Sequence, residues 1–293
     1  MIRLYALGSG SAGNAFAVET PEGFLLVDAG FSAKEIERRA RRLGLAPERL
    51  LAIALTHEHG DHAGGAVRLA RKFEVPVLAT PGTLSALARQ GGAPPRRPLR
   101  TSGLVEFGPF SVGCCPILHD AAEPVALAIE CGSVRLGVAY DFGRPTAGLR
   151  YLLREMDAVV LEANYDELLL RTSDYPPSVQ HRIAGSGGHL SNRGTAELLR
   201  ELFTTRLRTV VLAHLSQRCN TREAAIRTVR PALEIRGFRG RLEVALQDEG
   251  LGPLDLTREQ GDPSGAEVSA PCPGPEEPGS NRDELWEGRF DEA

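Results

Sequence analysis

Three histidines and an aspartate fall within six positions of one stretch, Leu55-Thr56-His57-Glu58-His59-Gly60-Asp61-His62-Ala63-Gly64-Gly65. His57 and His59 lie two positions apart on an extended segment, so their side chains point the same way and can share one metal ion. Asp61 and His62 come at the turn into a helix and are displaced from that pair, so they can serve a second ion nearby. Imidazole and carboxylate ligands suit zinc, and also manganese or iron.

The elements on either side of this stretch predict where it lies in the fold. Residues 50–55 form an apolar run that is typical of a buried strand, and residues 63–73 carry apolar side chains at helical spacing. The candidate ligands therefore lie where a strand passes into a helix, at the carboxyl edge of a sheet, which is where open α/β sheets place their sites. The alternative is a polar surface loop with incidental histidines. Because the chain has seven histidines in all, three in one hexapeptide argue against that alternative.

The pattern His57-x-His59-x-Asp61-His62 resembles the signature of the metallo-β-lactamase-fold hydrolases. This resemblance implies an α/β fold, an αββα sandwich of two mixed β-sheets flanked by helices. It also implies two divalent metal ions, Zn²⁺ or Mn²⁺, as cofactors. The pattern identifies the superfamily and leaves the substrate open.

The resemblance assigns further site residues at the ends of predicted strands. His119 follows the strand 110–118 and would complete the His57/His59 site. His214 follows the strand 209–213 and would join Asp61 and His62 on the second ion. Asp141 follows the hairpin 125–139 and would bridge both ions, and Asp28, after the strand 24–27, would support the metal loop from behind the ligands. The implied ligands are thus His57, His59, Asp61, His62, His119, Asp141 and His214.

Two later segments resemble those of ribonuclease Z-like nucleases. They are Glu162-Ala163-Asn164, which closes the strand 158–161, and Gly188-His189-Leu190-Ser191. The resemblance implies that His189, oriented by Glu162, protonates the leaving oxygen of a phosphodiester, a role that suits an imidazole near neutral pH. The predicted catalytic residues are therefore Asp61, Glu162 and His189.

A helix is predicted over residues 193–203, with Ser191 or Asn192 as its N-cap. The positive end of this helix and its free N–H groups would lie beside His189, an arrangement that suits an anionic phosphate. Ser191 and Asn192 are therefore predicted to bind phosphate.

Over residues 1–249 the chain resembles the WalJ/YycJ-type single-domain exonucleases of this fold. The resemblance implies a metal-dependent phosphodiesterase, a 5′-to-3′ exonuclease that acts on DNA rather than RNA with a hydroxide activated by two metal ions. One departure is Arg218-Cys219-Asn220, where the family pattern has Glu-Asn-Asn. Between Asp141 and His214 the predicted strands and helices leave no room for a separate nucleic-acid clamp domain.

Two other functions remain open at this stage. The first is a small-molecule metallo-hydrolase of the same fold that acts on a thioester, a lactone or a cyclic phosphodiester. The second is a non-catalytic binding or regulatory protein with a structural metal, which is disfavoured because every ligand position is filled. The oligomeric state is left open.

Composition predicts two regions. With 293 residues and 42% apolar composition, the chain can form one large hydrolase domain at residues 1–249. Residues 250–293 are rich in Pro, Gly and Glu and are predicted to be a disordered acidic tail. The net charge is −4 overall, but residues 251–293 hold eleven acidic residues and three arginines, which leaves a mildly basic body. That balance permits a polyanionic substrate.

The cellular location is predicted from features that the sequence lacks. No apolar run is long enough to span a bilayer, and the N-terminus runs directly into strand-like sequence without a signal peptide's pattern. The five cysteines are odd in number and show no disulfide framework, which favours a reducing compartment. We therefore expect a cytoplasmic protein without a membrane partner.

Overall fold

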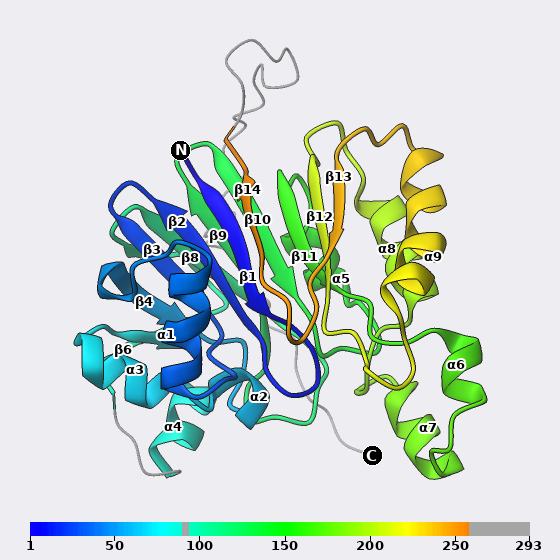
Figure 1. Ribbon diagram of the computed structural model, residues 1–293, viewed down its shortest axis with the longest axis horizontal. Helices are drawn as coiled ribbons and strands as arrows, with labels where there is room; N and C mark the ends of the chain where they lie inside the picture. The colour runs from blue at the N-terminus through cyan, green and yellow to red at the C-terminus, as the bar shows by residue number, and fades with distance from the viewer. Residues whose placement is uncertain (90–93, 258–293) are drawn as a thin grey trace, which may run out of the picture. The chain divides into compact units, whose positions relative to one another are not determined.

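The computed structural model describes residues 1–89 and 94–257, and these contain two seven-stranded β-sheets (Figure 1). The first sheet has the strand order β14-β1-β2-β3-β4-β5-β6. Its strands are β1 (Arg3–Gly8), β2 (Ala15–Thr20), β3 (Gly23–Val27), β4 (Leu50–Ala54), β5 (Val77–Ala79), β6 (Arg96–Pro98) and β14 (Leu251–Asp255). The second sheet has the order β13-β12-β11-β10-β9-β8-β7. Its strands are β7 (Val105–Phe107), β8 (Phe110–Pro116), β9 (Val125–Cys131), β10 (Val134–Ala139), β11 (Ala158–Glu162), β12 (Thr209–Ala213) and β13 (Arg241–Val244).

The two sheets follow the same plan. In the first, β1, β2 and β3 pair antiparallel, and β3 to β6 pair parallel. In the second, β7 to β10 pair antiparallel, and β10 to β13 pair parallel. Each sheet therefore has a parallel half whose strands end at a common edge, and parallel strands carry their sites at that edge.

The strands alternate between two apolar faces. In β1, Leu4 and Ala6 belong to the apolar cluster between the sheets, whereas Tyr5 and Leu7 belong to the cluster under the helices of the first sheet. The helices of the first sheet are α1 (Ala33–Arg42), α3 (Ala66–Phe73) and α4 (Pro81–Arg89). A third cluster joins the second sheet to α5 (Ala147–Leu152), α8 (Asn192–Leu202) and α9 (Arg222–Glu234). The expected αββα sandwich of two mixed sheets is confirmed.

The helix predicted over residues 63–73 is wrong in its start and in its continuity. The structure has a single turn, α2 (Gly60–Ala63), and then α3 as a separate helix. The break arises because the Asp61 carbonyl accepts a hydrogen bond from the Asn14 N–H, at 2.8 Å, while the Gly65 N–H donates to the Ala29 carbonyl, also at 2.8 Å. Gly30 permits this approach, since a Cβ there would lie 1.7 Å from the Asp61 carbonyl oxygen.

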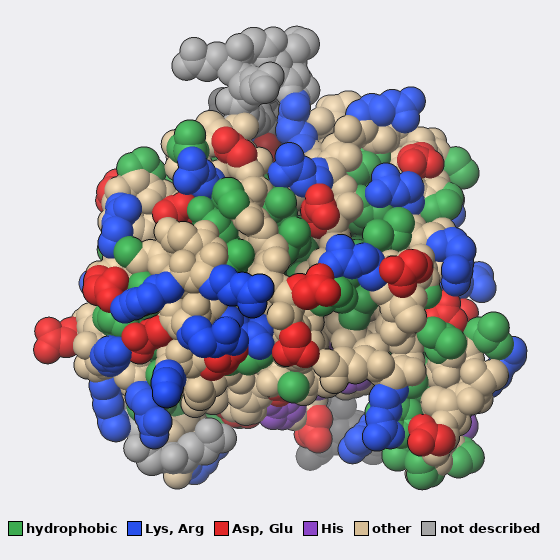
Figure 2. Space-filling view, in the orientation of Figure 1, with side chains coloured by type: hydrophobic (Ala, Val, Ile, Leu, Met, Phe, Trp, Pro, Cys, Tyr) green, Lys and Arg blue, Asp and Glu red, His purple; other side chains and the backbone are tan. Residues whose placement is uncertain are grey.

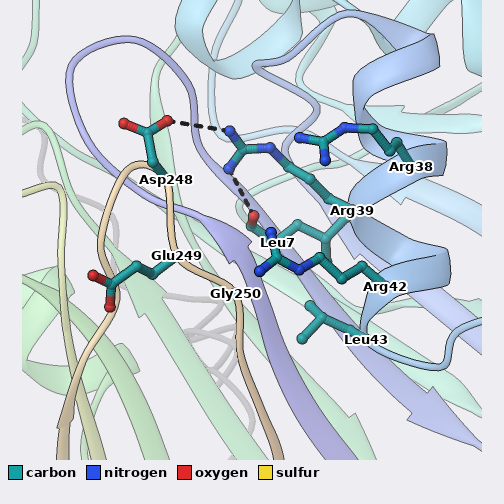
Figure 3. Close-up of a pocket in the computed structure, with 8 residues that line it drawn as sticks. All are labelled: Leu7, Arg38, Arg39, Arg42, Leu43, Asp248, Glu249 and Gly250. Carbon is teal, nitrogen blue, oxygen red and sulfur yellow. Dashed lines mark hydrogen bonds and ion pairs between the residues drawn. The ribbon is translucent and has the colours of Figure 1, made fainter.

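The predicted boundary of the folded body at residue 249 is too early. β14 pairs antiparallel with β1, and Leu254 and Leu256 are buried in the cluster between the sheets. Arg39 of α1 holds the segment that leads into β14, because its Nη1 donates to the Leu7 carbonyl at 2.9 Å (Figure 3). The same Nη1 donates to the Gln247 carbonyl at 2.7 Å. Residues 258–293 of the predicted tail lie outside the described residues.

Three short elements complete the chain. A 3₁₀ turn, η1 (Pro47–Arg49), precedes β4, and two helices, α6 (Glu167–Arg171) and α7 (Pro177–Ile183), follow β11. Among the described residues there is no helix with the length and apolar character needed to cross a bilayer.

Candidate metal centre

The candidate site lies where the parallel halves of the two sheets end. Asp28 follows β3, His57 follows β4 after two residues, Asp141 follows β10 and His214 follows β12. Figure 2 shows histidine side chains at the lower edge of the molecule, below the ends of these strands. Asp28, Asp141 and His214 have left-handed backbone conformations, with φ of 56°, 60° and 55°. Such conformations cost on the order of 1–3 kcal/mol each in a non-glycine residue, so the surrounding contacts must hold them.

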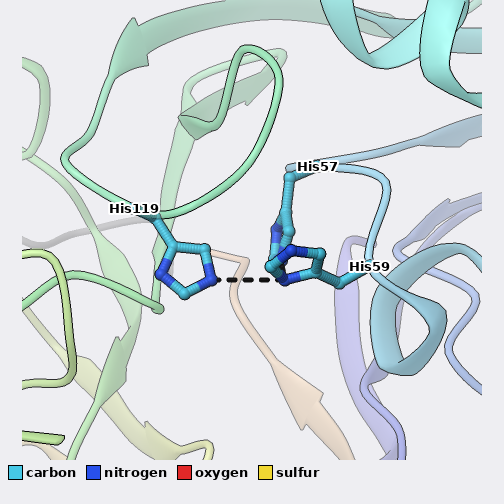
Figure 4. A group of neighbouring side chains, drawn as sticks. All are labelled: His57, His59 and His119. Carbon is cyan, nitrogen blue, oxygen red and sulfur yellow. Dashed lines mark hydrogen bonds between the residues drawn. The ribbon is translucent and has the colours of Figure 1, made fainter. Parts of the chain in front are cut away.

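The first ligand group consists of His57, His59 and His119, whose rings converge (Figure 4). His57 Nε2 lies 3.1 Å from His59 Nδ1, and His119 Nε2 lies 3.3 Å from the same atom. His57 is buried, whereas His59 and His119 are half-buried. Three imidazole nitrogens at this spacing can ligate one divalent ion.

The second ligand group consists of Asp61, His62 and His214. Asp61 Oδ2 lies 3.5 Å from His62 Nε2 and 3.8 Å from His214 Nε2. His62 and His214 are buried, and the Asp61 side chain is half-buried. The structure thus brings the four residues of the sequence motif into two groups, as the spacing predicts.

Asp141 lies between the two groups. Its Oδ2 is 2.8 Å from His62 Nε2 and 3.7 Å from His57 Nε2. The short contact with His62 does not have the geometry of a hydrogen bond, so this oxygen and His214 Nε2 are both buried without a hydrogen-bond partner among the described residues. Buried polar atoms almost always have a hydrogen-bond partner, so two such atoms that face the ligand groups without one indicate that they bind cations. The residues present therefore fit a pair of divalent ions.

Asp28 supports the second group as predicted from its position. It is fully buried, and its carboxylate accepts hydrogen bonds from the Thr56 N–H and hydroxyl, each at 2.8 Å. The Tyr140 hydroxyl donates to it at 2.7 Å, and His62 Nδ1 lies 2.7 Å from Oδ2. Asp28 thereby fixes the His62 ring and leaves Nε2 to face the site, the arrangement in which carboxylates orient ligating histidines.

Sequence reasoning missed several residues that support the ligands. The Ser9 hydroxyl accepts from the His214 N–H at 2.8 Å and donates to Asn14, whose Nδ2 lies 3.2 Å from His62 Nε2. The Glu58 carboxylate accepts from the Ala122 N–H at 2.7 Å and so fastens the loop of His119. For Ser9 and Asn14 the available signal was the turn-forming stretch Gly8-Ser9-Gly10-Ser11-Ala12-Gly13-Asn14, which lies between two strand-like segments. For Glu58 it was a carboxylate inside the metal motif.

The pKa of the buried histidine of the first group and the pKa values of the two buried histidines of the second group are shifted in opposite directions. Burial, together with the neighbouring His62, lowers the pKa of His57 well below its ordinary value. Burial also opposes charging of His62 and His214, but nearby carboxylates outweigh it. Asp141 and Asp28 raise the pKa of His62 well above its ordinary value, and Asp141 and Asp61 raise the pKa of His214 to about 9. The same negative potential attracts a divalent cation, whose binding would displace these protons.

Glu162, which is buried, and His189, which is half-buried, form a pair beside the second group. Glu162 is fully buried, and its Oε1 lies 2.8 Å from His189 Nδ1 and 3.0 Å from His214 Nδ1. Its Oε2 accepts from the N–H groups of Phe142 and Leu190, each at 3.1 Å. Burial would lower the pKa of His189, but Glu162 and Asp141 outweigh it and raise that pKa to about 10. Glu162 therefore orients two imidazoles, where the sequence predicted one.

A cavity of about 510 Å³ opens beside these groups. Its lining includes His59, His119 and His189, together with Arg182 and the glycine-rich loop 185–188. The Gly187 carbonyl lies 3.3 Å from His119 Nδ1, so this loop also contacts the first ligand group. Since Nδ1 of His189 faces Glu162, Nε2 is the nitrogen left to face the cavity.

The predicted phosphate site at Ser191 and Asn192 is wrong for the side chains. Ser191 is the N-cap of α8, and its buried hydroxyl accepts from the Gly194 N–H and donates to Glu167. The Asn192 side chain is buried and exchanges two hydrogen bonds with Asn220, at 2.8 and 2.9 Å. Its N–H donates to the Tyr165 carbonyl. These groups already have partners within the protein, so they are not free to bind a phosphate.

Comparisons with known proteins cover most of the chain. Residues 8–121 match the metallo-beta-lactamase superfamily model. The chain is 35% identical over 235 residues to the exodeoxyribonuclease YycJ of Bacillus anthracis, in an alignment that covers 79% of this chain and 89% of the relative. It is 31% identical over 228 residues to the exodeoxyribonuclease WalJ of Streptococcus pneumoniae, covering 76% and 85%. Among solved structures, the metallo-beta-lactamase fold protein YhfI of Bacillus subtilis has a TM-score of 0.64 at 15% identity, over 86% of this chain and 100% of that one.

Proposed function

The chain belongs to the metallo-β-lactamase superfamily of hydrolases, and we propose that it is a two-metal phosphodiesterase that degrades DNA from the 5′ end. Two relatives that align over most of both chains are named exodeoxyribonucleases. The direction of degradation and the choice of DNA over RNA come from the resemblance to that group.

In this proposal the first ion is held by His57, His59 and His119 and the second by Asp61, His62 and His214, with Asp141 between them. Zn²⁺ and Mn²⁺ both suit this donor set. Divalent ions in such a pair lower the pKa of water and stabilise charge on the oxygens of a phosphodiester. Asp28, Ser9 and Asn14 keep the second group in position.

The observation that carries the proposal is the pairing of Glu162 with His189. Hydrolysis of a phosphodiester leaves an alkoxide oxygen that needs a proton at neutral pH, and an imidazole held by a carboxylate can donate it. Nδ1 of His189 is fixed by Glu162 at 2.8 Å, so Nε2 is the atom that would donate the proton. The side chain is 24% exposed and lines the cavity, so a substrate can reach it.

The test compares His189→Ala with the wild type on two substrates. The variant should keep both ions, because His189 is not needed as a ligand. On DNA it should lose on the order of 10²–10⁴-fold in rate, the usual contribution of a general acid. On a methyl nitrophenyl phosphodiester the loss should be much smaller, because nitrophenolate leaves readily without a proton.

Three other outcomes would overturn the proposal in different ways. Loss of one ion would make His189 a ligand, which its proximity to Asp141, Glu162 and His214 allows geometrically. An equal loss on both substrates would make it a structural residue. A wild-type protein that cleaves a thioester or lactone and leaves phosphodiesters intact would be the small-molecule hydrolase considered from the sequence.

A further inference from the structure

Between β11 and His189 the chain leaves the second sheet and forms α6 and α7, which lie together at the lower right of Figure 1. No residue of α7 is buried. The segment instead has a small apolar cluster of its own, formed by Tyr165, Leu170, Tyr175, Ile183 and Cys219. α7 is therefore an exposed helix, and its side chains contribute little to the packing of the apolar core. It borders the cavity of about 510 Å³ beside the ligand groups, which we call the catalytic cavity.

α7 is the wall between two cavities. Arg182 and Ile183 at its end line the catalytic cavity together with His189. Pro177, Gln180 and other residues of its opposite side line a second cavity of about 370 Å³, which we call the α6–α7 cavity. The two cavities are thus separated by one turn of exposed helix. A backbone hydrogen bond also connects the end of α7 to His189 in the catalytic cavity, because the His189 N–H donates to the Ile183 carbonyl at 2.8 Å.

The lining of the α6–α7 cavity is mainly apolar, with polar atoms at one side. Its apolar part includes the Tyr165 ring and the side chains of Leu170, Pro177 and Ala184. Gln180 and His181 supply neutral polar atoms, and Glu167 and Arg171 supply charged ones. The side chains of Tyr165 and Leu170 are largely buried, at 7% and 5% exposure, so they contribute only the surface that borders the cavity, beside the exposed Pro177 and Ala184. Apolar surfaces that include part of an aromatic ring can take a nucleobase without regard to base identity.

The polar atoms of this cavity are partly engaged. Gln180 Nε2 donates to the Tyr175 carbonyl at 2.9 Å, which leaves its Oε1 as an acceptor. His181 Nδ1 lies 2.8 Å from the Pro177 carbonyl, which leaves Nε2 toward solvent. A base edge, which carries both donors and acceptors, can bond to such atoms.

Two exposed arginines flank the wall. Arg182 lies on the catalytic side and Arg171 on the side of the α6–α7 cavity. Within residues 1–89 and 94–257, neither has a carboxylate within ion-pair distance. The one acidic side chain of the α6–α7 cavity, Glu167, accepts a hydrogen bond from the Ser191 hydroxyl at 3.2 Å. The positive charge is therefore available for phosphates on both sides of α7.

We propose that the α6–α7 cavity binds a nucleobase of the strand whose phosphate occupies the catalytic cavity, and that Arg182 binds the phosphate between them. This inference rests on the proposed function, because it requires a nucleic acid strand in the catalytic cavity. One nucleotide then spans α7, with its backbone over Arg182 and its base against Tyr165. The contact favours a single strand over a duplex, since a paired base cannot enter a cavity.

The test is an abasic scan. Single-stranded oligonucleotides, each with one abasic residue at a successive position from the cleaved end, are digested by the metal-loaded full chain. The oligonucleotide with the abasic residue at one particular position should have a kcat/KM about tenfold lower than the intact oligonucleotide. This is the size of the contact that one base makes with an aromatic side chain. Ala184→Phe, which fills the α6–α7 cavity from an exposed position, should lower kcat/KM on the intact oligonucleotide by a similar factor. It should also abolish the positional effect of the abasic residue.

Arg182→Ala should raise KM for DNA, and it should raise KM for a methyl nitrophenyl phosphodiester by a smaller factor, because that substrate has no neighbouring nucleotide for Arg182 to hold in place. The matched control is Arg200→Ala, which removes the same charge from an exposed position of α8 and should change neither substrate. If the wild type cuts DNA but no abasic position matters, or if Ala184→Phe behaves as the wild type, the inference is wrong while the proposed function stands. If the wild type cuts no DNA at all, both are wrong.

Discussion

The two ligand groups use similar side chains but are supported in different ways. The second group, Asp61, His62 and His214, is held from behind by buried partners that come from both sheets. Asp28 alone accepts four hydrogen bonds or close contacts there, from Thr56, His62 and Tyr140. The first group has two half-buried members, and the loop that carries His119 is fastened near the surface. We infer that the second group is the more rigid of the two.

The difference follows from where the ligands come from in the chain. His62 lies in α2, which packs against the end of β3, and His214 directly follows the buried strand β12. His119 comes three residues after β8, in a loop without regular structure. A ligand next to a buried strand is held in position by the sheet, whereas a ligand in a loop needs a separate hydrogen bond to hold it. For His119 that hydrogen bond is the one from the Ala122 N–H to Glu58.

The largest expected effect comes from removing what the two groups share. Asp141→Asn replaces the carboxylate that lies between them with a neutral amide of the same shape. Both ions should bind much more weakly, and hydrolysis should be abolished. Metal content after gel filtration, measured beside the rate on DNA, checks this. A variant with full metal content and full activity would show that Asp141 is not a ligand.

Asp28→Ala should weaken metal binding by the second group more than by the first. It removes the carboxylate that fixes the His62 ring, so affinity of the second group should fall about 10–100-fold, the usual effect of losing such a partner. The first group, which Asp28 reaches only through the Thr56 hydroxyl beside His57 Nδ1, should lose less affinity and serves as the comparison within the same molecule. Titration of the apoprotein with Zn²⁺ gives both constants. Equal weakening of both sites would mean that Asp28 supports the whole loop rather than one group.

The pH dependence of metal binding should also differ between the groups. The pKa of His57 lies below its ordinary value, so the imidazole is already neutral at pH 7 and the first ion displaces no proton from it. The pKa of His214 is about 9 and that of His62 lies above its ordinary value, so the second ion must displace protons. Its affinity should therefore rise between pH 6 and pH 8, by up to about tenfold per pH unit for each proton. Mn²⁺ titrations at several pH values test this, and parallel slopes for both ions would contradict it.

The smallest effect is expected from Glu58→Ala. It removes one hydrogen bond to the Ala122 N–H, so affinity of the first group should fall by about tenfold or less, while the second group is unchanged. Glu58→Gln keeps an acceptor oxygen and should lie between the variant and the wild type. The comparison would be reversed if Glu58→Ala weakened the second ion more than the first.

The sequence indicated which candidate ligands the structure brings together, but not which residues support them. His57, His59, Asp61 and His62 stand in a dense motif, and the remaining ligands each follow an apolar run that reads as a strand. Ser9 supports His214 across 205 positions of sequence, a contact that depends on the closure of both sheets. No local pattern encodes such a contact.

The sequence errors have local causes as well. A helix N-terminus predicted an anion site at Ser191 and Asn192, but the structure uses Asn192 to pair with Asn220 from another loop. β6 consists of three exposed residues, Arg96–Pro98, and the sequence has no strand-like pattern there from which it could be predicted. β14 lies in a stretch rich in Gly and Pro, and only its pairing with β1 makes it a strand.

The most direct test of the central claim is release of label from DNA by the wild-type protein loaded with Zn²⁺ or Mn²⁺. A strand labelled at its 5′ end should lose the label at once as a mononucleotide, whereas the same strand labelled at its 3′ end should shorten stepwise and keep the label until late. The matching RNA should be degraded more slowly. Intact DNA in the presence of two bound ions would contradict the account.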